Sequence, residues 1–133
     1  FLDVLFPDQD TTYFKDINDA SLVVRLVYNE VQIILTGDAS LSIEKFLVAS
    51  DRELLESQVL KLGHHGSKTS SSDEFLKTVR PEIAIVSAGK NNSYGHPAPE
   101  VVDRVRKNNI TLLSTQELGT ITLLSDGKSI WRK

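Results

Sequence analysis

Cysteine and methionine are both absent from this sequence of 133 residues. Without cysteine the chain has no disulfides and no thiolate metal sites, so histidine, aspartate and glutamate are the side chains left to bind a transition metal. A complete translation product normally starts with methionine, whereas this chain starts with Phe1. We therefore expect the chain to be an excised or processed part of a longer protein.

Long hydrophobic runs are also missing. No apolar stretch approaches the roughly 20 residues that cross a bilayer, and the N-terminus lacks the charged start and small-residue cleavage site of a signal peptide. A hydrophobic content of 40% is sufficient for a core, and 25% charged residues suit a polar surface. The sequence predicts one soluble domain.

An overall excess of positive charge is absent as well. The net charge of -3 argues against a protein whose whole surface is a nucleic-acid platform. Locally the balance differs, because residues 60–72 contain Lys61 and Lys68 without an acid, and residues 87–97 contain only Lys90. These segments can receive an anion such as phosphate, although lysines on loops are more often ordinary solvated side chains.

Runs with strand and helix patterns alternate along the chain and predict an α/β fold. A tight hairpin is expected at Asn29-Glu30, and a helix cap at Ser71 or Ser72. The run 83–87 is apolar enough for a strand covered on both faces. The predicted strands cover residues 2–6, 21–28, 31–36, 58–62, 83–87, 111–113, 119–124 and 129–131. The predicted helices cover residues 41–47, 51–56, 73–79 and 100–107.

Three polar loops each follow a predicted strand and together contain all three histidines of the chain. They contain Asp38, the adjacent pair His64 and His65, and His96. The carboxyl ends of parallel strands meet at one edge of a sheet, where ligands bind, so these side chains can converge. Carboxylate and imidazole suit Zn, Mn or Fe, and a bound metal lowers the pKa of water toward neutrality.

Each of these residues also has a simpler interpretation. Asp38 fits a turn residue or a helix cap, and His96 fits a loop residue stacked on Tyr94. Adjacent side chains point in different directions, so His64 and His65 need not bind the same ion. One of the pair can instead contact substrate or orient another ligand.

Hydroxyl and lysine side chains near the histidines are candidates for phosphate binding, although a serine run is also typical of linkers and helix caps. A serine nucleophile is the weaker hypothesis because no Gly-x-Ser-x-Gly elbow is present, and no glycine motif for nucleotide phosphates occurs. The candidate substrate- or phosphate-binding residues are Ser67, Lys68, Thr69, Ser70, Lys90 and Tyr94.

Four segments, residues 18–26, 35–38, 60–72 and 86–97, occur in order along nearly the whole chain. Together they resemble the C-terminal metallo-β-lactamase-like domain of ComEC-type DNA-internalisation competence proteins. The resemblance implies half of an αββα sandwich, a mixed sheet flanked by helices, with residues 1–133 as the C-terminal portion of the domain. It also implies a soluble domain of a bacterial cytoplasmic-membrane protein, with DNA and the membrane channel part of the same parent protein as partners.

The resemblance also implies a site. Asp38 matches the aspartate that bridges two metal ions, and His64, His65 and His96 match later metal-binding motifs, with Asp38 and His65 in catalytic roles. Zn or Mn is the expected metal of the intact domain. The family's His-x-His-x-Asp-His loop does not precede Asp38 in this sequence. We therefore expect weak or no metal binding by this chain alone, and exposed apolar surface that favours a homodimer.

The function predicted for the intact domain is hydrolysis of DNA phosphodiester bonds by a metal-activated water during DNA uptake in natural competence, the first step of transformation. The chain alone is expected to be inactive. One alternative is a non-catalytic module that binds DNA or a partner on the channel. Another is a small-molecule metallo-hydrolase of the same superfamily.

Overall fold

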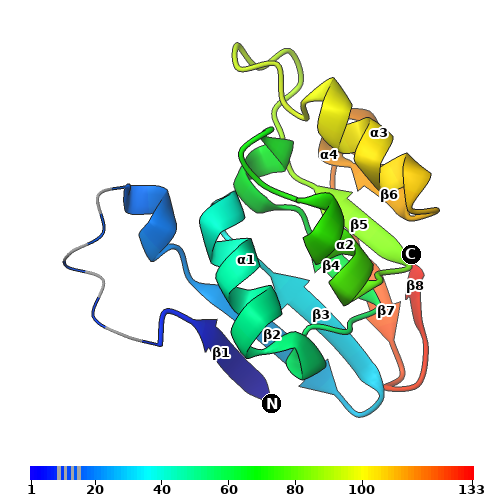
Figure 1. Cartoon of the computed structure of the whole chain (residues 1–133). Helices are drawn as coiled ribbons and strands as arrows, with labels where there is room; N and C mark the ends of the chain where they lie inside the picture. The colour runs from blue at the N-terminus through cyan, green and yellow to red at the C-terminus, as the bar shows by residue number, and fades with distance from the viewer. Residues whose placement is uncertain (9, 11, 13, 15) are drawn as a thin grey trace.

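A mixed sheet of six strands forms the centre of the computed structural model, which describes residues 1–8, 10, 12, 14 and 16–133 (Figure 1). The strands follow one another across the sheet in sequence order. The first three pair antiparallel, and the third to the sixth pair parallel. They are β1 (Leu2–Phe6), β2 (Val23–Tyr28), β3 (Val31–Leu35), β4 (Val59–Lys61), β5 (Ile83–Val86) and β6 (Thr111–Ser114).

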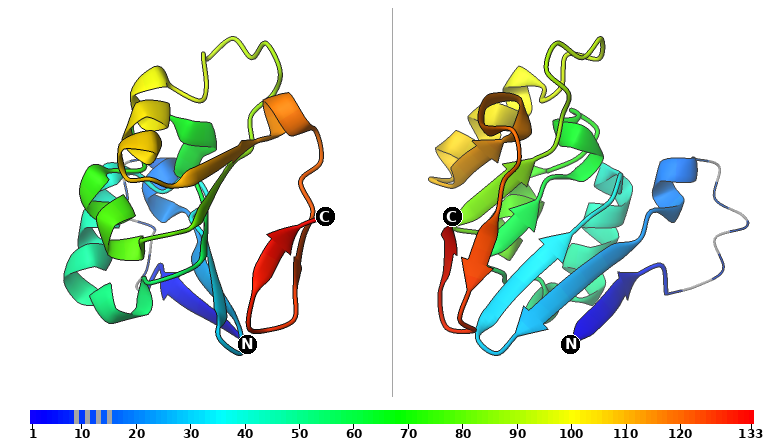
Figure 2. Two further views of the ribbon diagram at one scale, coloured as in Figure 1. Left: turned by 90° about the vertical axis from the view of Figure 1, so that its right-hand side faces the viewer. Right: turned by 180° about the vertical axis from the view of Figure 1, so that it is seen from behind.

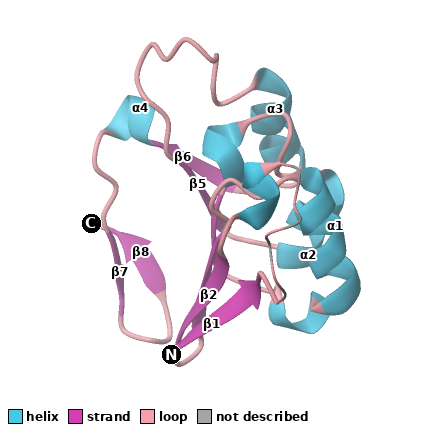
Figure 3. Ribbon diagram, turned by 90° about the vertical axis from the view of Figure 1, so that its left-hand side faces the viewer, coloured by secondary structure: helices cyan, strands magenta, loops and turns pink. Residues whose placement is uncertain are grey.

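Three helices cover one face of this sheet (Figure 3). Ile34, Leu60 and Ala84 occupy matching register positions on neighbouring strands and are fully buried beneath the helices. Leu47 and Val101, from the first and third helix, are equally buried in the same core. Burial of this apolar layer fixes the sheet's position relative to the helices. The helices are α1 (Leu41–Ser50), α2 (Asp73–Val79) and α3 (Pro99–Lys107).

The opposite face of the sheet keeps large apolar side chains at its surface. The pairs Leu2–Leu26 and Val24–Leu35 align on this face, and Leu2, Leu26 and Leu35 are 56%, 39% and 41% exposed. A sheet with helices on one side and an exposed apolar face on the other is one half of a four-layer sandwich. The predicted fold class, a mixed sheet flanked by helices as half of an αββα sandwich, is confirmed.

The C-terminal part of the chain turns back on the side of the sheet away from the helices (Figure 2). There a short helix, α4 (Thr115–Leu118), precedes a hairpin of β7 (Leu123–Ser125) and β8 (Ile130–Arg132). The backbone N–H of Glu30 donates to the carbonyl of Gly127 at 2.8 Å, which joins the hairpin tip to the turn between β2 and β3.

Local signals predicted most boundaries, with two corrections. The strand expected over 119–124 begins only at Leu123, because Ser114 caps the one-turn helix α4 through the N–H of Gln116, and the chain leaves that helix through Gly119. The helix expected over 51–56 is a single 3₁₀ turn, since Asp51 leaves the helical conformation at φ -126°. By contrast α2 has the predicted bounds. No helix in the described part of the chain is both long and apolar enough to cross a membrane.

Candidate functional site

The three polar loops identified in the sequence lie at the carboxyl ends of β3, β4 and β5, on one edge of the sheet (Figure 1). Backbone hydrogen bonds connect them. The N–H of His64 donates to the carbonyl of Gly37 at 3.0 Å, and the N–H of Ala98 donates to the carbonyl of Gly66 at 2.9 Å. The parallel strand order thus brings the loop of Asp38 and both histidine loops into one connected surface, as predicted.

The histidine pair lies in a turn of unusual backbone geometry. His64, His65 and Gly66 all have positive φ, at 46°, 55° and 77°. A left-handed conformation costs a residue with a Cβ about 1–2 kcal/mol, and such strain concentrates at functional sites. The turn is closed by the N–H of Ser67, which donates to the carbonyl of His64 at 2.9 Å. This geometry presents both imidazoles on the loop surface.

The structure brings all three imidazole rings together. The ring centroids of His64 and His96 are 5.9 Å apart, and those of His64 and His65 are 6.4 Å apart. His64 therefore neighbours both other histidines. The adjacent rings of His64 and His65 make an angle of 64°, in keeping with the expectation that they point in different directions.

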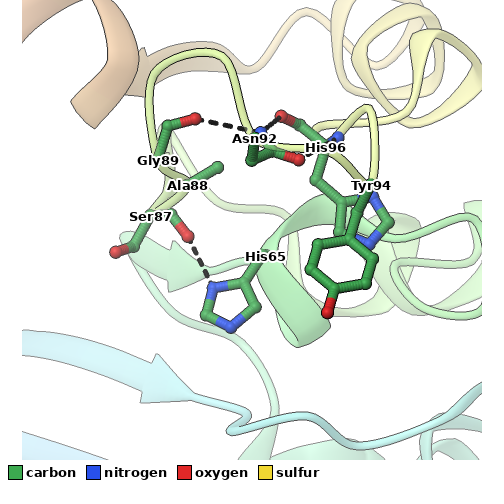
Figure 4. Close-up of a pocket in the computed structure, with 7 residues that line it drawn as sticks. All are labelled: His65, Ser87, Ala88, Gly89, Asn92, Tyr94 and His96. Atoms are coloured by element: carbon green, nitrogen blue, oxygen red, sulfur yellow. Dashed lines mark hydrogen bonds between the residues drawn. The ribbon is translucent and has the colours of Figure 1, made fainter.

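A carbonyl oxygen orients His65. Its Nδ1 lies 2.7 Å from the oxygen of Ser87 (Figure 4). A carbonyl can only accept, so Nδ1 carries a proton and donates it, and in the neutral tautomer this leaves the lone pair on Nε2. An imidazole fixed through one nitrogen with the other one free is the usual arrangement for metal ligation or for proton transfer.

His96 carries a nitrogen without a partner. Its Nδ1 is buried and has no hydrogen-bond partner among the described residues. Burial lowers the pKa of His96, and the neighbouring His64 and His65 lower it further. The ring is therefore biased toward its neutral form, which is the form that binds metals. A buried polar atom of this kind usually has a partner in the functional state.

Two amides that the sequence interpretation missed hold the His96 loop. The Nδ2 of Asn92 donates to the carbonyl of His96 at 2.6 Å, and Oδ1 of Asn92 accepts from the N–H of His96 at 3.0 Å. Gln116, on α4, donates to the same carbonyl at 2.8 Å. Nothing local in the sequence marks Gln116, because α4 reaches the loop only through the tertiary fold.

Asp38 follows β3, and Lys61 ends the neighbouring strand β4. The backbone N–H of Asp38 donates to Oγ of Ser21 at 3.2 Å, which holds its loop against the start of β2. Burial lowers the pKa of Lys61, and the charge of Asp38 acts in the opposite direction. The Nζ of Lys61 also donates to the carbonyl of Leu62 at 2.8 Å.

The predicted phosphate-binding residues fall into two groups. Ser67 and Ser70 are buried, and Oγ of Ser70 donates to the carbonyl of Gly63 at 2.8 Å, so these serines shape the loop. Lys68 and Thr69 are exposed on the histidine loop. Lys90 and Tyr94 are exposed on the His96 loop. Their roles toward a substrate stay predictions.

The serine loop, residues 70–72, is held by a buried acid on one helix and a base on another. The sequence did not lead us to expect either contact. Glu44 of α1 is 1% exposed and accepts from the backbone N–H groups of Ser71 and Ser72, the latter at 2.8 Å. Arg104 of α3 donates to the carbonyls of Ser70, at 3.2 Å, and Ser71. Burial raises the pKa of Glu44, while the Ser72 and Ser71 hydrogen bonds and the Arg104 charge oppose this. The sequence did offer a signal for this contact, because Glu44 lies next to Ile43 on the apolar side of α1, where an acid needs a polar partner.

These residues do not complete a metal site. Among residues 1–8, 10, 12, 14 and 16–133, no group of three or more histidine, aspartate and glutamate side chains is placed to hold an ion. Imidazole and carboxylate are the right donors for Zn or Mn, but their number and placement here are insufficient. The expectation of weak metal binding by this chain alone stays a prediction consistent with this geometry.

A small cavity lies between the histidine loop and the His96 loop (Figure 4). Its volume is about 290 Å³, at the lower end for small-molecule sites. Figure 4 shows His65 on one side and the rings of Tyr94 and His96 on the other. The cavity is lined by His65, Ser87, Ala88, Gly89, Asn92, Tyr94 and His96.

Comparison with known proteins finds relatives that match most of this chain. The chain is 45% identical over 106 residues to the Competence protein ComA of Neisseria gonorrhoeae, a match covering 80% of this chain and 15% of the relative. It is 40% identical over 104 residues to the ComE operon protein 3 of Bacillus subtilis, covering 78% and 13%. It is 35% identical over 104 residues to the Recombination protein 2 of Haemophilus influenzae, covering 78% and 13%.

The chain thus spans only a small part of the length of these relatives. Their similarity confirms the resemblance to ComEC-type proteins that the ordered motifs predicted. The metallo-beta-lactamase superfamily matches residues 2–90, which include β1 to β5 and the loops of Asp38 and the histidine pair. Members of this superfamily usually bind divalent metals. The half sandwich, the loops at its strand ends and this match lead to one conclusion: the chain belongs to the metallo-β-lactamase superfamily.

Proposed function

We propose that this chain is the C-terminal portion of the metallo-β-lactamase-like domain in a bacterial DNA-uptake protein, and that the intact domain hydrolyses DNA phosphodiester bonds. The observation that carries the proposal is the convergence of Asp38's loop and three histidines at one sheet edge. The identity of 45% to a relative named Competence protein ComA supports a role in DNA uptake. Uptake would place the parent protein in the cytoplasmic membrane, with its channel part as partner.

The proposed roles follow from the site. His65, with its free Nε2, would accept or deliver a proton or bind the metal, and His96 would face the same ion through a neutral ring. Zn or Mn in the intact domain would activate water. Since the described residues do not complete a ligand set, the remaining ligands must come from elsewhere in the parent protein.

Substrate positioning is the second proposed role. Lys68 and Thr69 are exposed on the loop of His64 and His65, and Lys90 is exposed on the loop of His96, and these side chains would orient a phosphate. Ser67 and Ser70 would act through the loop they shape. We also propose that the exposed apolar face of the sheet packs against the other half of the sandwich, or, in the isolated chain, against a second copy.

A second candidate function is a non-catalytic module that binds DNA or docks on the channel, which the incomplete ligand set favours. A small-molecule metallo-hydrolase is the third and has no specific observation in its support.

The test uses the full-length protein loaded with Mn or Zn, assayed on single-stranded DNA, duplex DNA and a phosphodiester monomer, together with transformation frequency. Asp38→Ala and His65→Ala should each lower DNA cleavage by about 100-fold. The matched control is Asp103→Ala, at an exposed position on α3, which should leave cleavage unchanged. Absence of DNA cleavage, with uptake unaffected by Asp38→Ala, would refute hydrolysis and favour the binding module. Cleavage of the monomer alone would favour the small-molecule enzyme.

A further inference from the structure

Tyr94 is the most exposed aromatic side chain near the site, at 82%. Its ring stacks on His96 with centroids 5.9 Å apart and an interplanar angle of 18°. A tyrosine exposed to this extent contributes little to the core. Its remaining ring surface is therefore available to a ligand that stacks.

The loop that carries Tyr94 is held in place before any ligand arrives. Besides its bonds to His96, Nδ2 of Asn92 donates to the carbonyl of Gly89 at 2.9 Å. Gln116 donates to the same carbonyl, also at 2.9 Å. Both ends of the loop are thus fixed by side-chain amides, so the ring of Tyr94 is presented without a large ordering cost on binding.

The cavity beside Tyr94 suits a planar ring better than an anion. Tyr94, His96 and His65 contribute rings to its lining, and Asn92 and residues 87–89 complete it (Figure 4). No lysine or arginine of the described part of the chain lines it. The volume of about 290 Å³ is suited to one small ring system. In Figure 4 the Tyr94 hydroxyl and the free edge of His65 point the same way.

We propose that the Tyr94 side of this cavity binds a nucleobase of single-stranded DNA, stacked on the exposed face of the Tyr94 ring, while the histidine side is left for the metal and the neighbouring phosphate. The identity of the ligand as DNA rests on the proposed function. The base must be unpaired, because a base inside a duplex is covered by its neighbours and cannot enter a cavity. Every base has a π face, so the site is expected to show little sequence preference.

The experiment measures binding of the full-length protein to oligo-dT, and to a set of the same oligonucleotides with one abasic site at successive positions, in EDTA so that no cleavage occurs. Tyr94→Ala should weaken oligo-dT binding about 10-fold, and Tyr94→Phe, which keeps the ring, should bind like the wild type. Ser93→Ala, at the exposed neighbouring position, controls for disturbance of the loop.

Stacking further predicts a coupling between the ring and one base. A single abasic position should weaken wild-type binding about 10-fold and should have little effect in Tyr94→Ala. If Tyr94→Ala binds oligo-dT as tightly as the wild type, the inference is wrong. It is also wrong if Tyr94→Ala lowers the affinity for every abasic oligonucleotide by the same factor as for oligo-dT, because then no single base is coupled to the ring. The assay measures binding without turnover, so the two hypotheses fail separately. Absence of DNA hydrolysis would not refute base stacking on Tyr94, and absence of the coupling would not refute hydrolysis.

Discussion

Replacing Glu44 tests whether a buried carboxylate holds the serine loop beside the histidines. Both of its oxygens are used, one by the N–H of Ser71 and one by the N–H of Ser72. Glutamine keeps the shape but offers one accepting oxygen, so one buried N–H loses its partner at a cost of about 1–3 kcal/mol in the free energy of unfolding. Alanine leaves both N–H groups unpaired, which doubles the expected cost to about 2–6 kcal/mol.

The assay is urea unfolding of the 133-residue chain followed by circular dichroism, with the midpoint compared at constant m. Amide hydrogen exchange at Ser71 and Ser72 should accelerate in both variants. Glu74→Gln, at an exposed position in the first turn of α2, is the matched control and should change the free energy of unfolding by less than about 0.5 kcal/mol. Glu44→Ala with stability within that margin of the wild type would refute the reasoning.

The pH dependence gives an independent check. Burial raises the pKa of Glu44 above its ordinary value of 4.5 in the folded state. The folded state therefore binds the proton of the Glu44 carboxyl more tightly than the unfolded state does. The stability that this protonation contributes is fully present below the unfolded pKa and is lost as the pH rises through the folded pKa. The stability of the wild type minus that of Glu44→Gln should fall as the pH rises from 4.5. A difference that grows over this range would contradict the raised pKa.

Three further predictions concern the loops and the metal. In Gly66→Ala the new Cβ would lie 2.7 Å from Cβ of Pro97 at φ +77°, and we expect a loss of about 2–4 kcal/mol in the free energy of unfolding, measured with urea. The control is Gly95→Ala, at φ +70° with no atom of the described residues within 4 Å of the new Cβ, which should lose about 1 kcal/mol. Equal losses in the two variants would argue against the clash with Pro97. Ser72→Ala removes the oxygen that accepts from the N–H of Phe75 at 3.1 Å. It should lower the free energy of unfolding by about 1 kcal/mol in the same measurement, and no loss would mean that this cap does not stabilise α2. Metal analysis of the purified chain should find no tightly bound equivalent, because no three-ligand group exists among the described residues, and one tight equivalent per chain would overturn this.

Elements with strong local signals were predictable from the sequence. The helix α2 has the predicted bounds because Ser72 caps its start and Pro81 lies just past its end. The β2–β3 hairpin was predictable because two β-branched runs flank Asn29-Glu30. The helix α4 was missed, since a single turn carries too little periodicity to be recognised.

The candidate site was predictable in part. That Asp38 and the histidines follow strands is visible in the sequence, and parallel pairing then places them on one edge. The free Nε2 of His65 was not predictable, because it depends on a carbonyl 22 positions away at Ser87. The same holds for Gln116, which reaches the His96 loop from α4.

The sequence by itself determined the order and type of most elements, the class of fold and the donor chemistry of the site, because periodicity, caps and turns act over a few neighbouring residues. Only the tertiary structure decided which histidines meet, which nitrogen of His65 stays free, and that Glu44 is buried in contact with the serine loop. These properties depend on groups far apart in the chain, and they arise only when the helices pack on the sheet and exclude water.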